Sequence, residues 1–238
     1  TGTHLGQLSL VINNNFLELL HTPDFKKSYG GYHDELEKVA SEFSSSPLPS
    51  LFHPIVISKD KFPILKEHAE TMAKILDTVV KLYLAHQPVR QFFNFPPTLE
   101  EWIKIAPGYD INIPVSRYDG FWSNGNYKFC EFNTDGSAGM DEASTIAEAF
   151  LKTSVGKKLN KKHSLKHFEL RRSILDILLE CYRQFNPNKV PNIAIVDFME
   201  SATKAEFLSL KKFFCEQNFK TQICDIRNLK LKKNGLWC

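Results

Sequence analysis

The sequence predicts a mixed α/β fold in which a helical N-terminal region precedes a mixed sheet. Apolar residues recur at three- and four-residue spacing through much of the first hundred positions, and two strand-like runs flank a turn near residue 125. Two short apolar runs also flank a helical segment between residues 192 and 225. We expect a mainly helical region, residues 1–110, and an α/β region, residues 111–238, that together form one compact domain.

Proline- and serine-rich segments divide the N-terminal region into helices. Ser44–Ser50 predicts a loop, and Asn94–Pro97 interrupts the helical spacing. Around these breaks the predicted elements are, in chain order, helices at Leu5–Leu20 and Tyr32–Phe43, a strand or extended run at His53–Ser58, a long helix from Leu65 to Tyr83 and a short helix at Leu99–Ile105.

Two polar pairs interrupt the strand-like sequence between residues 115 and 133. Arg117 and Asp119 are two residues apart, and so are Glu131 and Asn133. Successive side chains of a strand point to opposite faces, so each pair projects from a single face. One cation, two carboxylates and one amide on a single patch of sheet can hold a divalent metal ion and a phosphate group. The alternative is an ordinary hairpin whose polar edge meets water.

The register of this hairpin decides whether the two pairs share a face. A two-residue turn at Asn124-Gly125 would put Asp119 opposite Cys130 and would turn Glu131 to the other face. A three-residue loop at Asn124–Asn126 would put Asp119 opposite Glu131. We predict this loop, or another odd-length loop or bulge, because only such a register lets the two carboxylates share a cation.

Helix and strand alternate in the C-terminal half. The predicted elements are helices at Met140–Leu151 and Leu165–Phe185, a buried strand at Asn192–Val196, a helix around Phe207–Phe214, a strand at Phe219–Asp225 and a hairpin from Leu229 to Trp237. The strand-helix-strand order implies parallel pairing and a Rossmann-like unit. Asp197 ends the first of these strands, where open α/β sheets bind ligands, although a capping or loop role is the simpler explanation.

Two further signals are weak. Gly136–Gly139 precedes a helix in the manner of a phosphate-binding loop, but short Gly/Ser loops are common. His163 and His167 are four residues apart within a basic run. Because the neighbouring sequence supplies no acidic or sulfur partner, we expect both imidazoles to face solvent.

Composition limits the partners and the compartment. A net charge of +3 is too small to indicate a nucleic-acid partner, and no apolar run approaches the roughly 18–20 residues needed to span a membrane. The five cysteines form no C-x-x-C pair and are odd in number, which favours free thiols, a reducing compartment and hence the cytoplasm. Cys130, within the hairpin, is predicted to be a buried thiol.

The hairpin residues resemble those of a known family. Arg117-Tyr118-Asp119-Gly120 and the later run from Tyr127 to Asp135, which contains Glu131-Phe132-Asn133, resemble the R-x-D and E-x-N motifs of the glutathionylspermidine synthase family. Eleven residues separate the Asp from the Glu, which is the family's spacing. Residues 192–237 add a weaker resemblance. Members of this family are ATP-dependent carboxylate–amine ligases with a circularly permuted ATP-grasp fold.

The resemblance implies a role for each residue of the motif. The implied roles are Mg²⁺ ligands at Asp119, Glu131 and Asn133, ATP-phosphate binding and catalysis by Arg117, and contacts with the carboxylate substrate from Asp135 and Ser137. The substrates would be a small carboxylate and a small amine, joined through an acyl phosphate. The family's nucleotide-gripping lysines fall beyond residue 238, so the resemblance also implies an incomplete ATP-grasp fold with a Rossmann-like pre-ATP-grasp unit.

Two other classes of function are open on the sequence. A metal-dependent nuclease also carries Asp and Glu-x-Lys on adjacent strands, but Asn133 stands in place of the lysine and the near-neutral charge fits DNA poorly. The other class is a non-catalytic interaction domain of the same fold. A lysine-bearing ATP-grasp segment encoded downstream of Cys238 would favour the ligase over both.

Overall fold

The computed structural model describes residues 12, 14–43, 45–123, 126–134, 137–200, 203–233 and 235–237. The chain separates into two compact units that interleave along the sequence. Unit 1 comprises Thr1–Val56, Ala138–Leu175 and Val190–Cys238, and unit 2 comprises Ile57–Ser137 and Asp176–Lys189. Each unit therefore draws segments from both sides of residue 110.

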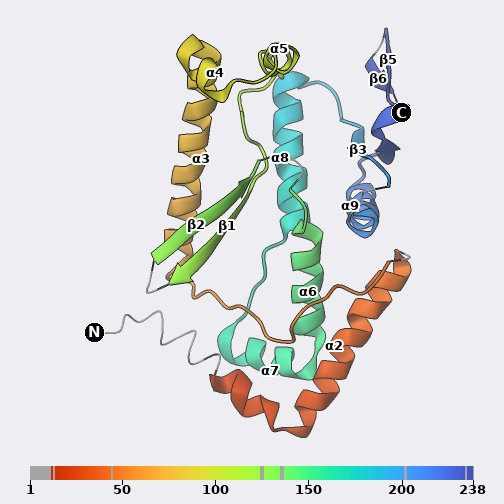
Figure 1. Cartoon of the computed structure of the whole chain (residues 1–238). Helices are drawn as coiled ribbons and strands as arrows, with labels where there is room; N and C mark the ends of the chain where they lie inside the picture. Colours follow the sequence, from red (N-terminus) through yellow and green to blue (C-terminus); the bar gives the residue numbers. More distant parts are fainter. Residues whose placement is uncertain are drawn as a thin grey trace. The chain divides into compact units, whose positions relative to one another are not determined.

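Helices provide most of the regular structure (Figure 1). Residues 14–20 are helical, and the labelled helices are α2 (Pro23–Glu42), α3 (Phe62–Ala85), α4 (Gln87–Phe93), α5 (Pro97–Ile103), α6 (Met140–Lys152), α7 (Ser154–His163), α8 (Leu170–Phe185) and α9 (Lys204–Glu216), with a 3₁₀ turn, η1, at Ile226–Asn228.

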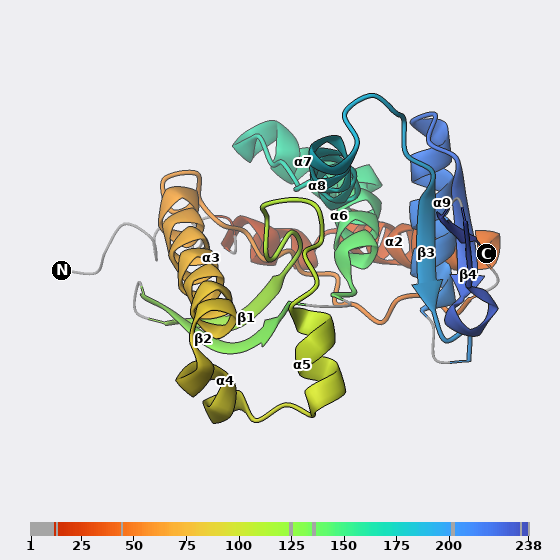
Figure 2. The same ribbon diagram turned by 90° about the horizontal axis from the view of Figure 1, so that it is seen from above.

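The strands of the described residues form three two-stranded sheets. The antiparallel pairs are β1 (Arg117–Ser123) with β2 (Asn126–Asn133) and β5 (Lys230–Lys232) with β6 (Gly235–Trp237), and the parallel pair is β3 (Ile193–Asp197) with β4 (Thr221–Asp225). Helix α9 connects the parallel strands and packs against β4 (Figure 2). The predicted mixed α/β class and the parallel strand pairing are confirmed.

Unit 1 has its hydrophobic core where α2, α6 and α7 meet. The buried residues of this core are Phe16, Tyr32, Leu36, Phe52, Ala149, Phe150, Val155 and Leu159. Tyr32 is fully buried, and its hydroxyl lies 2.5 Å from Ser50 Oγ, so the polar end of the ring keeps a hydrogen bond. The core therefore joins an early segment of the chain to a segment about a hundred residues later.

Thr153 forms the corner between α6 and α7. Its hydroxyl donates to the Phe150 carbonyl at 2.7 Å and accepts the Gly156 amide at 3.0 Å, which caps the start of α7. The two helix ends approach so closely that a Cβ atom on Gly156 would collide with the Phe150 carbonyl oxygen. The corner therefore requires glycine at this position.

Several predicted boundaries differ from the structure. Helix α2 starts earlier than predicted, at Pro23, because proline is well suited to the first helical position. Helix α8 starts later than predicted, at Leu170, since Ser164 adopts a left-handed conformation (φ +52°) that ends α7. His53–Ser58 was predicted to be a strand or an extended run. It is an extended run, because no strand of the described residues pairs with it.

In unit 2, aromatic residues gather around the end of α3. Tyr83 is buried, and the ring centroids of Phe93 and Phe95 lie 5.6 Å and 5.9 Å from its own. Other large apolar side chains of this unit are exposed, among them Phe92 and Phe121. The described part of unit 2 therefore has a much smaller core than unit 1.

Candidate functional site

The β1–β2 hairpin contains a bulge at Cys130. The sequence allowed a bulge in this hairpin but did not indicate its position. Ser123 pairs with Asn126, so the register next to the turn is that of a two-residue turn, and the predicted three-residue loop is wrong. The register then shifts by one residue at Cys130. Beyond the shift Asp119 pairs with Glu131, which is the alignment that a bulge was expected to give.

The same shift brings the second polar pair into register. Arg117 pairs with Asn133, one step along the same face from the two carboxylates. The extra residue, Cys130, is exposed, so the prediction of a buried thiol is wrong. Because a bulged residue has no direct partner on the opposite strand, its side chain is not held in the ladder.

A glycine lies opposite the strand segment that precedes the bulge. A Cβ atom on Gly120 would come within 2.5 Å of Tyr127 Cζ and 2.6 Å of the Lys128 carbonyl oxygen. The Tyr127 hydroxyl donates to the Tyr118 carbonyl at 3.1 Å, which holds the ring across Gly120. Burial, and then the negative charge of Asp119, raise the pKa of Tyr127.

Replacing Gly120 with Ala is expected to destabilise the hairpin by about 1–3 kcal/mol, because the added methyl group must displace Tyr127 and the strand opposite. Urea unfolding of both variants checks this against Phe121→Ala, which truncates an exposed side chain on the same strand and should change stability by no more than about 0.5 kcal/mol. Equal effects of the two substitutions would show that the ring does not lie across Gly120.

Arg117 and Asp119 interact directly on this face. Arg117 Nε donates to Asp119 Oδ1 at 3.1 Å, and the two side chains are 45% and 38% exposed. The side chain of Glu131 is exposed, and it makes no hydrogen bond or ion pair with another described residue. One guanidinium group therefore faces two carboxylates, and the patch keeps a negative charge that a cation can neutralise.

The position of Asn133 adds an unsatisfied polar group. Its Nδ2 atom is buried and has no hydrogen-bond partner among the described residues. Its carbonyl oxygen accepts a hydrogen bond from Ser137 Oγ at 3.0 Å, which brings the predicted substrate residue Ser137 next to the motif. Asp135, the other predicted substrate residue, lies outside the described residues. Unsatisfied buried polar groups are uncommon in folded proteins.

These residues fit a hard divalent cation. Asp119, Glu131 and Asn133 offer two carboxylates and an amide oxygen, and Mg²⁺ binds oxygen ligands of this kind while keeping water or phosphate in its remaining positions. Arg117 supplies a planar donor set that matches a phosphate group. The arrangement can therefore hold a metal ion and a phosphate side by side.

The ends of the parallel strands are engaged differently. Asp197 accepts a hydrogen bond from the Phe198 amide at 2.7 Å, a local loop contact. Asp225, its partner in register, accepts hydrogen bonds from Arg227 Nε at 2.8 Å and from Arg227 Nη2 at 2.6 Å. The Arg227 hydrogen bonds hold the pKa of Asp225 well below its usual range. Asp225 was not identified from the sequence as a candidate site residue, although Asp225 ends a strand just as Asp197 does.

The N-terminus of α6 is already occupied by a carboxylate. Glu206 of α9, 5% exposed, accepts the amides of Gly139 at 3.0 Å and Asp141 at 3.2 Å. These amides would otherwise be the phosphate donors of the Gly136–Gly139 segment. Glu206 therefore argues against phosphate binding there, and its long sequence separation explains why the sequence did not indicate the contact. Burial raises the pKa of its neighbour Asp141.

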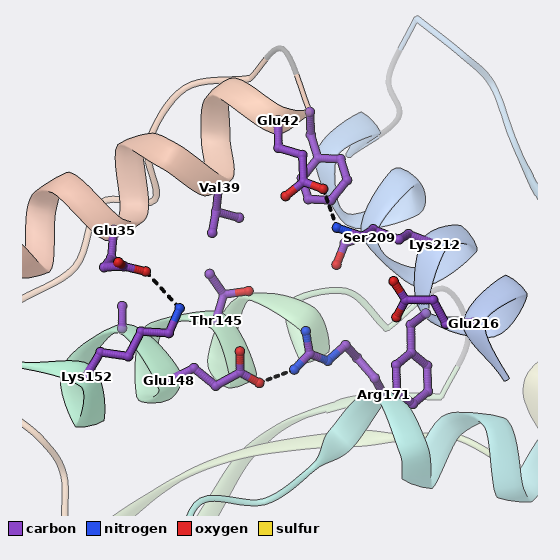
Figure 3. Close-up of a pocket in the computed structure, with 13 residues that line it drawn as sticks. Glu35, Val39, Glu42, Thr145, Glu148, Lys152, Arg171, Ser209, Lys212 and Glu216 are labelled. Carbon is purple, nitrogen blue, oxygen red and sulfur yellow. Dashed lines mark hydrogen bonds and ion pairs between the residues drawn. The ribbon is translucent and has the colours of Figure 1, made fainter.

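A cleft of ≈ 230 Å³ lies in unit 1 between α2, α6, α9 and the start of α8 (Figure 3). Its charged side chains form acid–base pairs: Glu35 with Lys152, Glu42 with Lys212, and Glu148 with Arg171. The pairing neutralises most of the charge that lines the cleft.

Comparisons with family models, curated proteins and solved structures give no match for this chain. In the part of the chain that the structure describes, no helix is both long enough and apolar enough to cross a membrane. Cys130, Cys181 and Cys215 are free thiols, whereas Cys224 is disulfide-bonded, so the expectation of free thiols throughout is wrong for Cys224.

Proposed function

We propose that this chain carries the Mg²⁺- and phosphate-binding hairpin of an ATP-dependent carboxylate–amine ligase, related to the glutathionylspermidine synthases and their permuted ATP-grasp fold. The observation that supports this best is the pairing of Asp119 with Glu131 beyond the Cys130 bulge. Two opposed carboxylates repel one another unless a cation lies between them. The family motif accounts for such a cation, whereas an ordinary polar edge does not.

Each residue of the patch has a distinct role in this proposal. Asp119, Glu131 and Asn133 would hold Mg²⁺, and the bound ion would supply positive charge next to the ATP phosphates. Arg117, now paired with Asp119, turns to the phosphoryl group and stabilises the charge that develops on it during transfer. In this scheme the γ-phosphoryl group passes from ATP to an oxygen of the substrate carboxylate and ADP leaves. The amine nitrogen then attacks the acyl carbon, phosphate leaves, and the nitrogen loses a proton to give the amide.

The loop after β2 supplies the substrate contacts in this proposal. Ser137 lies within hydrogen-bonding distance of the motif through the Asn133 carbonyl, so its hydroxyl can turn between that oxygen and a bound carboxylate. Asp135 is assigned to the same role by the resemblance. The partners in this proposal are small molecules, a carboxylate and an amine. We propose further that β3, α9 and β4 belong to the Rossmann-like pre-ATP-grasp unit.

Calorimetric titration of the 238-residue chain with ATP tests the proposal. We expect weak binding that requires Mg²⁺, and we expect Glu131→Gln to weaken it by about 10-fold or more, since removing one charged hydrogen-bonding partner costs about 1.5–3 kcal/mol. The matched control is Asp197→Asn, which should leave binding unchanged because, among the described residues, the Asp197 carboxylate makes only a local loop contact.

Two outcomes would contradict the proposal. Binding of ATP without Mg²⁺ would separate the nucleotide from the carboxylate pair. Equal loss of binding in Glu131→Gln and Asp197→Asn would place the nucleotide away from the hairpin. Mg²⁺-dependent cleavage of DNA by the chain would instead favour the alternative function, that of a metal-dependent nuclease.

A further inference from the structure

Three potential metal ligands gather in unit 1, a unit that does not contain the hairpin. Glu148 comes from α6, and His167 and Glu169 come from the segment between α7 and α8. One ligand atom from each of the three lies within 4.8 Å of the others. Glu148 and His167 are half-buried, and Glu169 is exposed. The set combines one imidazole with two carboxylates.

Arg171 in the first turn of α8 holds the two carboxylates in place. It pairs with Glu148, as Figure 3 shows, and its Nε donates to Glu169 Oε1 at 3.0 Å. The Arg171 side chain is only 16% exposed, so these contacts are fixed in the fold. Its bond to Glu148 uses Oε1, and its contact with Glu169 Oε2 is long, at 3.5 Å. Each carboxylate therefore keeps an oxygen that is free of a strong hydrogen bond to the guanidinium.

The hydrogen bond of His167 fixes which ring nitrogen can bind a metal ion. Nδ1 lies 3.2 Å from the carbonyl oxygen of Phe168. A carbonyl oxygen can only accept, so Nδ1 is the donor of this contact, which leaves Nε2 as the ring nitrogen available to coordinate a metal ion. Metal-binding histidines commonly show this pattern, with one nitrogen donating to a carbonyl or carboxylate and the other free to coordinate.

The charges around Arg171 are out of balance. Glu148 and Glu169 bring two carboxylates against one guanidinium, and Asp141 is a third carboxylate 3.6 Å from the same group. A network built only to neutralise Arg171 would need one carboxylate. The surplus of negative charge next to an imidazole is suited to a divalent cation.

We propose that Glu148, His167 and Glu169 bind a divalent transition-metal ion of the Zn²⁺ type, with Arg171 orienting both carboxylates. An imidazole ligand favours Zn²⁺ and Co²⁺ over Mg²⁺ and Ca²⁺, which prefer oxygen ligands. Three protein ligands leave the fourth position of a tetrahedral Zn²⁺ open to water or to a small ligand. This site is independent of the Mg²⁺ site proposed on the hairpin.

His163 does not belong to this site, although it lies four residues before His167. Helix α7 ends at His163, and Ser164 turns the chain out of the helix, so the two imidazoles do not share a helical face. His163 Nε2 lies 3.1 Å from Asn15 Nδ2 instead. Both imidazoles are half-buried, so the expectation of a solvent-facing pair is wrong.

Titration of the metal-stripped chain with Co²⁺ and Zn²⁺ tests the site. With excess Mg²⁺ present to occupy the hairpin, we expect one equivalent of Co²⁺ or Zn²⁺ to bind at this cluster. We expect His167→Ala to weaken that binding by more than the roughly 10–100-fold that loss of a supporting hydrogen bond costs at metal sites. Glu148→Gln, which keeps the side-chain shape, should also weaken it. His163→Ala is the matched control and should bind as the unaltered chain does. Excess Mg²⁺ should not compete.

The Co²⁺ absorption spectrum identifies the ligand class. Binding through nitrogen and oxygen gives no thiolate-to-cobalt charge-transfer band, whereas binding by an exposed cysteine such as Cys130 or Cys215 does. Circular dichroism of each variant shows that a lost signal is not lost folding. The proposal is overturned by the absence of binding, by a thiolate band, or by equal affinities of His167→Ala and His163→Ala.

Discussion

Replacing Asp119 with Asn is expected to lower ATP turnover by about 10²–10³-fold, the cost of removing one group that stabilises charge in a transition state. The substitution keeps the size of the side chain and removes one negative charge from the carboxylate pair with Glu131. It also weakens the contact that positions Arg117. The measurement, which rests on the proposed ligase function, is amine-dependent release of ADP with a panel of small carboxylates.

Cys130→Ala is the control for this prediction. The cysteine side chain is exposed at the bulge, and alanine can occupy the same backbone conformation, so the bulge and the register should persist. The expected change in stability is within about 0.5 kcal/mol, and turnover should be unchanged. If Cys130→Ala abolished turnover while Asp119→Asn left it intact, the ligase proposal would be wrong and thiol chemistry would replace it.

Gly156→Ala is expected to destabilise unit 1 by about 3 kcal/mol, the upper end of the cost of overpacking a core. The new Cβ atom would collide with the Phe150 carbonyl oxygen and lie 3.0 Å from Leu151 Cα. Both are backbone positions that no side-chain rotation can clear. Relief would require α6 and α7 to move apart at Thr153, which would open the core around Val155.

The same substitution in another helix should have the opposite sign. Gly31 lies inside α2, and a Cβ atom there meets nothing within 4 Å. Gly31→Ala should stabilise the protein by about 0.4–1 kcal/mol through lower entropy of the unfolded chain. Urea unfolding followed by circular dichroism measures both variants. Shifts of the same sign and size would show that the α6–α7 corner is not closely packed.

Local pattern predicted much of the structure. Helical apolar spacing indicated α3 and α6, and the strand-helix-strand order indicated that β3 and β4 run parallel. The polar pairs of the hairpin were also visible, because residues two apart on a strand share a face whatever the rest of the fold does. These features depend on backbone periodicity and on turn residues close in sequence, so a single sequence contains them.

Contacts between distant segments were decided only by the tertiary structure. A three-residue loop and a two-residue turn with a bulge give the same pairing of Asp119 with Glu131. The structure has the two-residue turn with the bulge, and there Tyr127 packs against Gly120. Glu206 reaches the start of α6 across more than sixty residues of sequence, and Glu148 meets His167 only after α7 has reversed the chain. Such contacts depend on how helices and strands pack, and the periodicity of side chains along the sequence does not determine that packing.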